Sequence, residues 1–361
     1  MAKILIAPDS FKGSATSAQV ARALADGWNI SRPHDEIVIA PFADGGEGTL
    51  DCIESVTPGS MRVPITVQGA SGIDHQSSWL LVDSDIAVIE MATLCGITTL
   101  DVLDPLGAHS YGLGQAIKAA LGDERVNEIL IAVGGSASTD AGLGALSALG
   151  FKATDTDGKE LALGGSDLHR LARVDIPAGL RKPDRGIKIL VDVQSPLTGL
   201  NGAAHIFGPQ KGADATQVQL LDVGLAHFLK VLNVEDRAGF GAAGGVSCGL
   251  AVLLNASIVS GVATIAELID LEEKIKLSDC VITGEGSFDD QSYRGKAVGY
   301  LLEKAKECER PVMIACGVNK NEESPSILSL IELAPSVQSA IADSQRWLIE
   351  CGRELATRFN H

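Results

Sequence analysis

Short aliphatic runs alternate along this chain with segments of helical periodicity. Residues 4–7 and 37–40 are continuous apolar runs, which predicts buried strands. Between them, Val20, Leu24 and Trp28 recur at four-residue spacing, as they would on one face of a helix. This strand–helix–strand rhythm predicts βαβ units and a mostly parallel sheet.

The pattern of hydrophobic and polar positions changes near residue 63. Residues 63–67 and 78–82 flank the glycine-containing segment 69–72, which predicts a hairpin, and 86–90 predicts a further strand. The βα rhythm then returns, with strands expected at 128–133 and 187–193 and a helix at 141–149. We therefore expect a mixed, partly antiparallel region.

The last third of the chain repeats the parallel pattern. Strands are expected at 280–283 and 311–315, and helices at 296–307 and 339–357. With 361 residues, two domains are the natural expectation. We predict an α/β fold, with a mostly parallel βαβ sheet domain from residues 1–62 and 275–361 and an inserted mixed α/β domain with hairpin strands from residues 63–274. Two contiguous halves are the alternative.

The charge balance limits the choice of partner. A formal net charge of −17 argues against nucleic acid or an anionic membrane as the main partner, and 4% aromatic residues argues against base stacking. Such a chain can bind an anion only where Lys, Arg, backbone N–H groups or Mg²⁺ create a local positive field.

Two features bear on the compartment. Residues 239–266 carry no charge and are long enough to span a membrane, but their glycines and hydroxyls favour a Gly-rich loop followed by a buried helix. The apolar run at 4–7 is too short for a signal peptide. The seven cysteines have no CxxC spacing, so we expect reduced thiols and a cytoplasmic protein.

Two familiar nucleotide motifs are missing from the sequence. No segment has the GxxxxGK[ST] pattern of a P-loop, and no GxGxxG is followed by an acidic residue at Rossmann spacing. The fold is therefore predicted not to be a P-loop fold.

Two candidate motifs follow the first two predicted strands. In residues 8–14 (PDSFKGS), Lys12 could meet a phosphate or a carboxylate, or be a solvated lysine. In residues 43–49 (ADGGEGT), Asp44 and Glu47 could bind Mg²⁺, bind substrate hydroxyls or accept a proton. An ordinary turn is the alternative for the second motif.

A third motif joins a predicted strand to a helix. Residues 134–142 (GGSASTDAG) offer backbone N–H groups and hydroxyls at a helix N-terminus, which suits an anion. Asp140 would repel a bare phosphate. It is therefore either a helix cap or a group that works beside Mg²⁺ or a substrate hydroxyl.

Further candidates lie in the middle of the chain. Asp192 ends a predicted buried strand, where an acid is costly unless it is paired or functional. Lys211, in the loop 207–212, is either a phosphate contact or a surface lysine. The Gly-rich segment 239–245 fits close approach to a ligand or to another helix equally well.

The densest motif spans residues 283–296 (TGEGSFDDQSYRGK). It places acids, an amide, glycines and a lysine in fourteen residues after a predicted strand. This composition suits a nucleotide or Mg²⁺ site, with Asp289 as the metal contact.

Five of these segments stand in the order found in one family. Residues 8–14, 43–49, 134–140, 207–213 and 283–296 resemble the bacterial glycerate kinase type 1 family, and the resemblance covers essentially the whole chain. It implies ATP-dependent phosphorylation of glycerate with Mg²⁺ on a two-domain α/β fold unlike other kinases. The members resembled most closely are associated with 2-phosphoglycerate as product.

From the motifs and this resemblance we expect a set of site residues. The catalytic residues expected are Asp192, Lys12 and Lys296, with Asp192 as the proton acceptor. The substrate-binding residues expected are Ser10, Asp44, Glu47, Ser136, Asp140 and Lys211. The nucleotide-binding residues expected are Gly134, Gly135, Gly244, Gly245, Gly284, Glu285, Gly286 and Gln291, and Asp289 is the expected metal ligand.

The chain departs from the family pattern at a few positions. The family usually has Asn at Thr139, Gly at Ala141 and Arg at Ser287, and it commonly has Thr-Asn at 194–195. Losing an arginine removes a bidentate donor for phosphate, which Arg294 could replace. These changes bear on substrate preference and efficiency more than on fold.

We therefore expect a cytoplasmic kinase that converts D-glycerate to 2-phosphoglycerate with ATP and Mg²⁺, with its main ligand cleft between domains. The alternatives are formation of 3-phosphoglycerate, action on another small hydroxy acid, or a non-catalytic sensor of glycerate or ATP. The expected partners are small molecules, not nucleic acid or membrane, and a homo-oligomer stays open.

Overall fold

Both ends of the chain contribute strands to one parallel sheet. The computed structural model describes residues 1–290, 292–293, 297–322, 324 and 326–359, and the strand order of this sheet is β13-β12-β11-β1-β2. The strands are β1 (Lys3–Ile6), β2 (Glu36–Ile39), β11 (Cys280–Phe288), β12 (Val312–Asn319) and β13 (Ile327–Ser329). Each neighbouring pair is parallel, so the carboxyl ends of the strands lie at the same edge.

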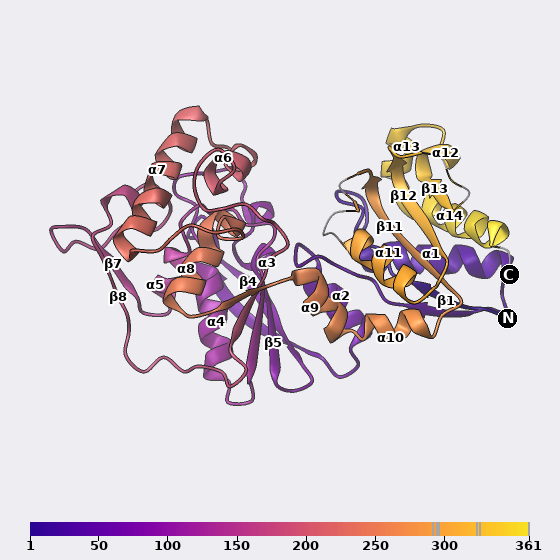
Figure 1. Cartoon of the computed structure of the whole chain (residues 1–361), viewed down its shortest axis with the longest axis horizontal. Helices are drawn as coiled ribbons and strands as arrows, with labels where there is room; N and C mark the ends of the chain where they lie inside the picture. Colours follow the sequence, from indigo (N-terminus) through magenta and orange to yellow (C-terminus); the bar gives the residue numbers. More distant parts are fainter. Residues whose placement is uncertain (291, 294–296, 323, 325, 360–361) are drawn as a thin grey trace. The chain divides into compact units, whose positions relative to one another are not determined.

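Helices cover both faces of this sheet. They are α1 (Ser17–Ser31), α2 (Thr49–Val56), α9 (Gly261–Leu268), α10 (Leu271–Lys276), α11 (Ala297–Glu307), α12 (Leu330–Leu333), α13 (Val337–Ala342) and α14 (Ser344–Arg358). Side chains alternate along β12: Met313 packs into the core formed with α1 and α14, whereas Ile314 packs with Val298 of α11. The helices therefore lie in two layers around the sheet (Figure 1).

The first helix begins as its sequence predicts. Thr16 caps α1 by accepting a hydrogen bond from the Gln19 amide, and the Gln19 side chain accepts one from the Thr16 amide. The predicted stripe of Val20, Leu24 and Trp28 is completely buried. Capping and burial together fix the length and the rotation of this helix.

A second sheet contains the predicted hairpin. Its order is β10-β9-β6-β5-β4-β3. The strands are β3 (Met61–Gln68), β4 (Asp74–Val82), β5 (Ile86–Glu90), β6 (Glu128–Ala132), β9 (Ile187–Leu190) and β10 (Ser257–Val259), and a separate pair is formed by β7 (Lys152–Thr154) and β8 (Arg173–Asp175). β3 and β4 are antiparallel with Val63 opposite Trp79, which confirms the hairpin, whereas β5, β6, β9 and β10 run parallel.

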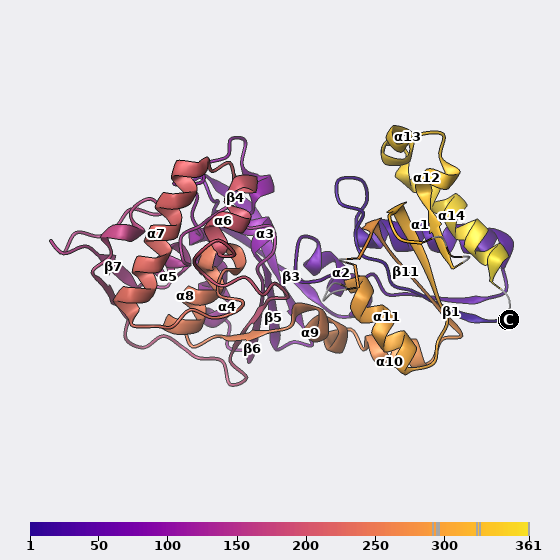
Figure 2. The ribbon, with the colours of Figure 1, turned by 45° about the horizontal axis from the view of Figure 1, so that its top comes forward.

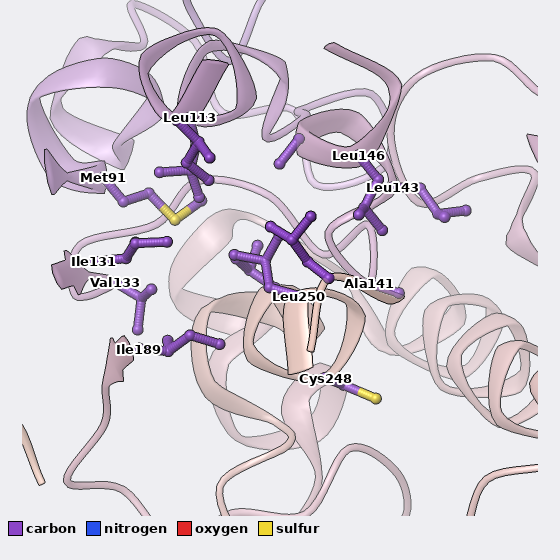
Figure 3. Close-up of a cluster of buried hydrophobic side chains, with 14 of the residues drawn as sticks. Met91, Leu113, Ile131, Val133, Ala141, Leu143, Leu146, Ile189, Cys248 and Leu250 are labelled. Carbon is purple, nitrogen blue, oxygen red and sulfur yellow. The ribbon is translucent and has the colours of Figure 1, made fainter. Parts of the chain in front are cut away.

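Helices pack on this second sheet through a large aliphatic core. They are α3 (Met91–Cys95), α4 (Tyr111–Gly122), α5 (Leu143–Ala148), α6 (Ala203–Phe207), α7 (Ala215–Leu232) and α8 (Val246–Leu253), with 3₁₀ turns η1 (Ile97–Thr99), η2 (Leu168–Arg170), η3 (Pro209–Lys211) and η4 (Ala242–Gly245). Ile131 and Ile189 from the sheet lie on one side of Leu250 of α8, and Leu146 of α5 lies on the other (Figure 3). α5 and α8 lie between the sheet and α7 (Figure 1 and Figure 2).

The chain divides into two compact units. Unit 1 comprises Met1–Asp44, Asp51–Pro58 and Val262–His361, and unit 2 comprises Gly45–Leu50 and Gly59–Gly261. The predicted fold class, a mostly parallel sheet plus a mixed sheet with hairpin strands, is confirmed. The predicted domain boundaries, between residues 62 and 63 and between residues 274 and 275, stay a prediction.

Three predicted elements end elsewhere. β11 continues to Phe288 because it keeps pairing with β12 as far as Asn319, so the first half of the motif 283–296 is strand. β9 ends at Leu190, level with the end of β6. The predicted closing helix is interrupted at Asp343, whose backbone is not helical.

The uncharged segment 239–266 does not form one long helix. It contains η4, α8, β10 and part of α9. None of the helices formed by the described residues combines the length and the hydropathy needed to cross a membrane.

The close contact of α1 with α14 gives a first testable prediction. A Cβ atom at Gly352 would lie 2.2 Å from the Leu24 carbonyl oxygen, and one at Gly27 would lie 1.9 Å from the Ile349 oxygen. Because backbone would have to move, Gly352→Ala should lower the free energy of unfolding by about 2 kcal/mol in urea titrations.

Gly122→Ala is the matched control. Gly122 ends α4, and a Cβ atom there would have no neighbour within 4 Å. That variant should be neutral or slightly more stable, because Ala favours helix. If Gly352→Ala and Gly122→Ala change the free energy of unfolding equally, the contact of α1 with α14 does not require glycine at position 352.

Candidate functional site

A pocket of about 500 Å³ lies at the carboxyl edge of the unit 1 sheet. Its wall brings together predicted site residues from three separate motifs, namely Ser10, Lys12, Asp44, Glu285, Gly286 and Asp289. They come from the chain segments after β1 and β2, from the second half of β11 and, for Asp289, from the position directly after β11. We call this site the unit 1 pocket.

Main-chain hydrogen bonds hold these segments together. The Asp9 amide donates to the Gly284 carbonyl at 2.8 Å, and the Phe42 amide donates to the Pro8 carbonyl at 2.9 Å. The Thr283 hydroxyl donates to the Ala7 carbonyl at 3.0 Å. The loops that carry the polar side chains are therefore continuations of the sheet.

Carboxylates outnumber lysines in the unit 1 pocket. Burial, and then the nearby Asp44, raises the pKa of Asp9 to about 7, although the Ser10 amide and Lys12 oppose the shift. Asp289 lies 3.6 Å from Lys320, a second pocket lysine that no motif indicated. At neutral pH, Asp9 can therefore both bind and release a proton.

The donor set of the pocket fits Mg²⁺ only together with a ligand. Among the described residues, no three His, Cys, Asp or Glu side chains are grouped to hold a metal ion by themselves. Mg²⁺ typically takes one or two carboxylates and completes its shell with phosphate oxygens and water. The carboxylates of the pocket meet the protein's part of that requirement.

A second group of predicted residues lies in unit 2 around a buried lysine. The Lys211 ammonium donates to the Ser136 hydroxyl at 2.9 Å and to the Ser138 carbonyl at 2.5 Å. Lys211 is only 3% exposed, so the surface-lysine alternative is wrong. Burial lowers the pKa of Lys211 to about 8, against the pull of the nearby Asp140 carboxylate.

Asp140 is satisfied by the protein's own donors. Its carboxylate accepts hydrogen bonds from the amides of Ser110, Gly142 and Gly144 at 2.8, 3.0 and 3.2 Å, and from the Ser110 hydroxyl at 2.7 Å. This geometry is that of the capping alternative, because the residue holds the start of α5. Its contact with substrate stays a prediction.

Close packing accounts for several of the predicted nucleotide-binding glycines. A Cβ atom at Gly244 would lie 2.1 Å from the Ser138 carbonyl oxygen, and one at Gly284 would lie 1.9 Å from the Ala315 oxygen. Gly134 and Gly245 are similarly constrained, whereas Gly135 is exposed with a φ of +71°. Nucleotide contact by these residues stays a prediction.

Asp192 lies just beyond β9 and is half-buried. Its Oδ1 atom accepts a hydrogen bond from the Ser260 hydroxyl at 2.8 Å and one from the Gly261 amide at 3.1 Å. These donors orient the carboxylate. Glu47, from the motif 43–49, is exposed on the part of that loop that belongs to unit 2.

Sequence reasoning missed Glu90, which is 1% exposed at the end of β5. Its two oxygens accept hydrogen bonds from the amides of Gly48 and Leu50 at 3.0 and 2.9 Å, so it holds the loop that carries Glu47. An acid at the end of a buried strand was the signal used for Asp192, and it would have found Glu90 as well. The predicted residues Gln291 and Lys296, and also Arg294, lie outside the described residues.

Residues 4–360 match the model of the glycerate kinase family. The chain belongs to the glycerate kinase family. It is 40% identical over 326 residues to glycerate 2-kinase of Escherichia coli K12, covering 87% of this chain and 85% of that protein. It is 35% identical over 373 residues to glycerate kinase of Halalkalibacterium halodurans, covering 99% and 98%.

A solved structure agrees with this assignment. A Salmonella typhimurium LT2 protein, assigned as a glycerate kinase 2, matches with a TM-score of 0.83 and 33% identity, covering 99% of this chain and 97% of that one. The resemblance drawn from the five motifs is thus confirmed, as is the α/β fold class. As a glycerate kinase family member the chain is a kinase, which implies ATP as co-substrate.

The shifted pKa of Asp9 predicts a pH-dependent gain in stability on its replacement. A carboxyl pKa raised from 3.8 to about 7 means that the folded protein loses stability as pH rises through that window. Asp9→Asn should remove this loss and raise the free energy of unfolding by up to about 4 kcal/mol above pH 7. Urea unfolding should show little difference near pH 4; an equal gain at both pH values would contradict the prediction.

The buried hydroxyl of Thr139 predicts a second stability difference. Its Oγ1 atom has no hydrogen-bond partner among the described residues, and the residue is 1% exposed. Thr139→Val should raise the unfolding midpoint by removing an unsatisfied polar atom worth about 1 kcal/mol.

Ser110→Ala is the comparison for Thr139→Val. The Ser110 hydroxyl donates to Asp140 and accepts from the Ala145 amide, so its loss should lower the midpoint. If Thr139→Val also lowers it, the Thr139 hydroxyl has a partner in solution.

Proposed function

We propose that this kinase transfers the γ-phosphoryl group of ATP to D-glycerate and forms 2-phosphoglycerate. The supporting observation is the gathering of three family motifs in one unit 1 pocket on a chain of the glycerate kinase family. The name of the Escherichia coli relative, glycerate 2-kinase, supports attack by the 2-hydroxyl group.

Phosphoryl transfer requires alignment of two anions and neutralisation of the moving group. In our proposal Lys12 and Mg²⁺ perform the neutralisation in the unit 1 pocket, with Asp289 as the metal contact. Bound Mg²⁺ would supply charge stabilisation at the phosphate oxygens. Lys296 keeps its expected catalytic role as a prediction.

Unit 2 is proposed to supply groups for the acceptor. Ser136 and Lys211 form a cationic, hydroxyl-bearing group suited to a small carboxylate. Asp192, oriented by Ser260, is the proposed proton acceptor for the glycerate hydroxyl.

The reaction is tested by incubating the purified protein with ATP, Mg²⁺ and D-glycerate and following products by phosphorus NMR. A 2-phosphoglycerate signal is expected. A 3-phosphoglycerate signal would overturn the site of attack and keep the kinase. Absence of any phosphorylated acid, from folded protein, would favour another hydroxy acid or a sensor, which a panel of acids would separate.

The role of Asp192 is tested by substitution. Asp192→Asn should keep both hydrogen-bond donors at one oxygen but remove the proton acceptor, so kcat should fall about a hundredfold or more. Asp184→Asn, at an exposed position, is the control and should leave kcat unchanged. Near wild-type turnover in Asp192→Asn would exclude Asp192 as the proton acceptor. Asp9, whose pKa of about 7 also suits a base, would then be the next candidate.

A further inference from the structure

One wall of the unit 1 pocket is apolar. It is formed by helices α12 and α13, which contribute Leu330, Ile331, Val337, Ala340 and Ile341. No sequence motif covers these residues. The pocket therefore has two different ends, one with carboxylates and lysines and one with aliphatic side chains.

Two of the aliphatic side chains are unusually exposed. Val337 is 48% exposed and Ile341 is 57% exposed, although both are large and apolar. They are four residues apart on α13 and so lie on the same side of that helix. Leu330 and Ala340 are buried at 2% and 5%. Apolar side chains gathered in a concave site mark a surface that a ligand covers.

We propose that this wall binds the purine base of ATP while the polar end of the pocket takes its phosphates. The inference rests on the proposed function, and it deepens it by naming a subsite. ATP has a flat, largely apolar base at one end and a polyanion at the other, which matches the two ends of the pocket. Glycerate has no comparable apolar surface and would gain nothing from α13.

Size and charge agree with this orientation. A pocket of about 500 Å³ lies within the range typical of small-molecule sites. Lys12 and Lys320 are both exposed and lie at the end of the pocket that holds the carboxylates, whereas α12 and α13 contain no basic residue. Among the described residues that line the pocket, positive charge for the phosphates is therefore found at the polar end, which leaves the base for the apolar wall.

The test is the double variant Val337→Ala/Ile341→Ala. Its dissociation constant for ATP in excess Mg²⁺, measured by calorimetry without glycerate, should rise about tenfold because apolar contact is lost. Inorganic tripolyphosphate carries no base, so its affinity should be the same for wild type and variant. Ile30→Ala is the matched control, since Ile30 is 61% exposed on α1 and does not line the pocket.

Several outcomes would overturn the base subsite. The first is an ATP affinity of the double variant within twofold of wild type. The second is an equal loss of affinity for ATP and for tripolyphosphate. The third is a double variant that binds glycerate more weakly but ATP as tightly as wild type. A change in oligomeric state at unchanged ATP affinity would instead make the wall an interface between copies of the chain. Failure of the proposed function is separate: wild type that binds ATP but does not phosphorylate glycerate would leave the subsite standing.

Discussion

The parallel pairing of β1 with β11 is the constraint on which the unit 1 pocket depends. Ile4 pairs with Cys280, so the two strands come from opposite ends of the chain. The hydrogen bond from the Asp9 amide to the Gly284 carbonyl extends this pairing to the loop that carries Lys12 and to the part of β11 that carries Glu285. The polar end of the pocket therefore exists only when both termini of the chain are in place. Such non-local pairing is slow to form, because loop closure precedes any gain from the contacts.

The ionisable groups of the two units have different surroundings. In the unit 1 pocket, burial and then the nearby Asp44 raise the pKa of Asp9 to about 7, which lowers the stability of the folded protein at neutral pH. In unit 2, Lys211 is buried among hydroxyl and carbonyl oxygens, and desolvation outweighs the attraction of Asp140. Because the chain has a net charge of −17, the proposed function needs Mg²⁺ to offset part of the negative charge around the ATP phosphates.

Much of the fold follows from local pattern, and less of the site does. The spacing of Val20, Leu24 and Trp28 identified the buried face of α1, and the glycines at 69–72 located the hairpin, because both signals are local. The extension of β11 to Phe288 depends on pairing with β12, which the segment's own glycines and acids do not reveal. Likewise, the burial of Lys211 and the apolar wall of α13 are products of tertiary packing. Motifs named most residues of the polar end, and no motif could name the apolar one.

The departures from the family pattern at residues 139 and 141 show why motif changes need not alter the fold. Ala141 has a φ of +53°, a left-handed conformation that costs an alanine about 1 kcal/mol and a glycine nearly nothing. Its amide donates to the Gly244 carbonyl at 3.1 Å, and the Gly142 amide that follows donates to Asp140. Neighbouring backbone thus fixes this loop whatever residue stands at 141. Substitution at residue 141 therefore changes the local free energy of this turn. The hydrogen bonds of Lys211 to Ser136 and Ser138 involve residues that precede the turn, so they do not depend on residue 141.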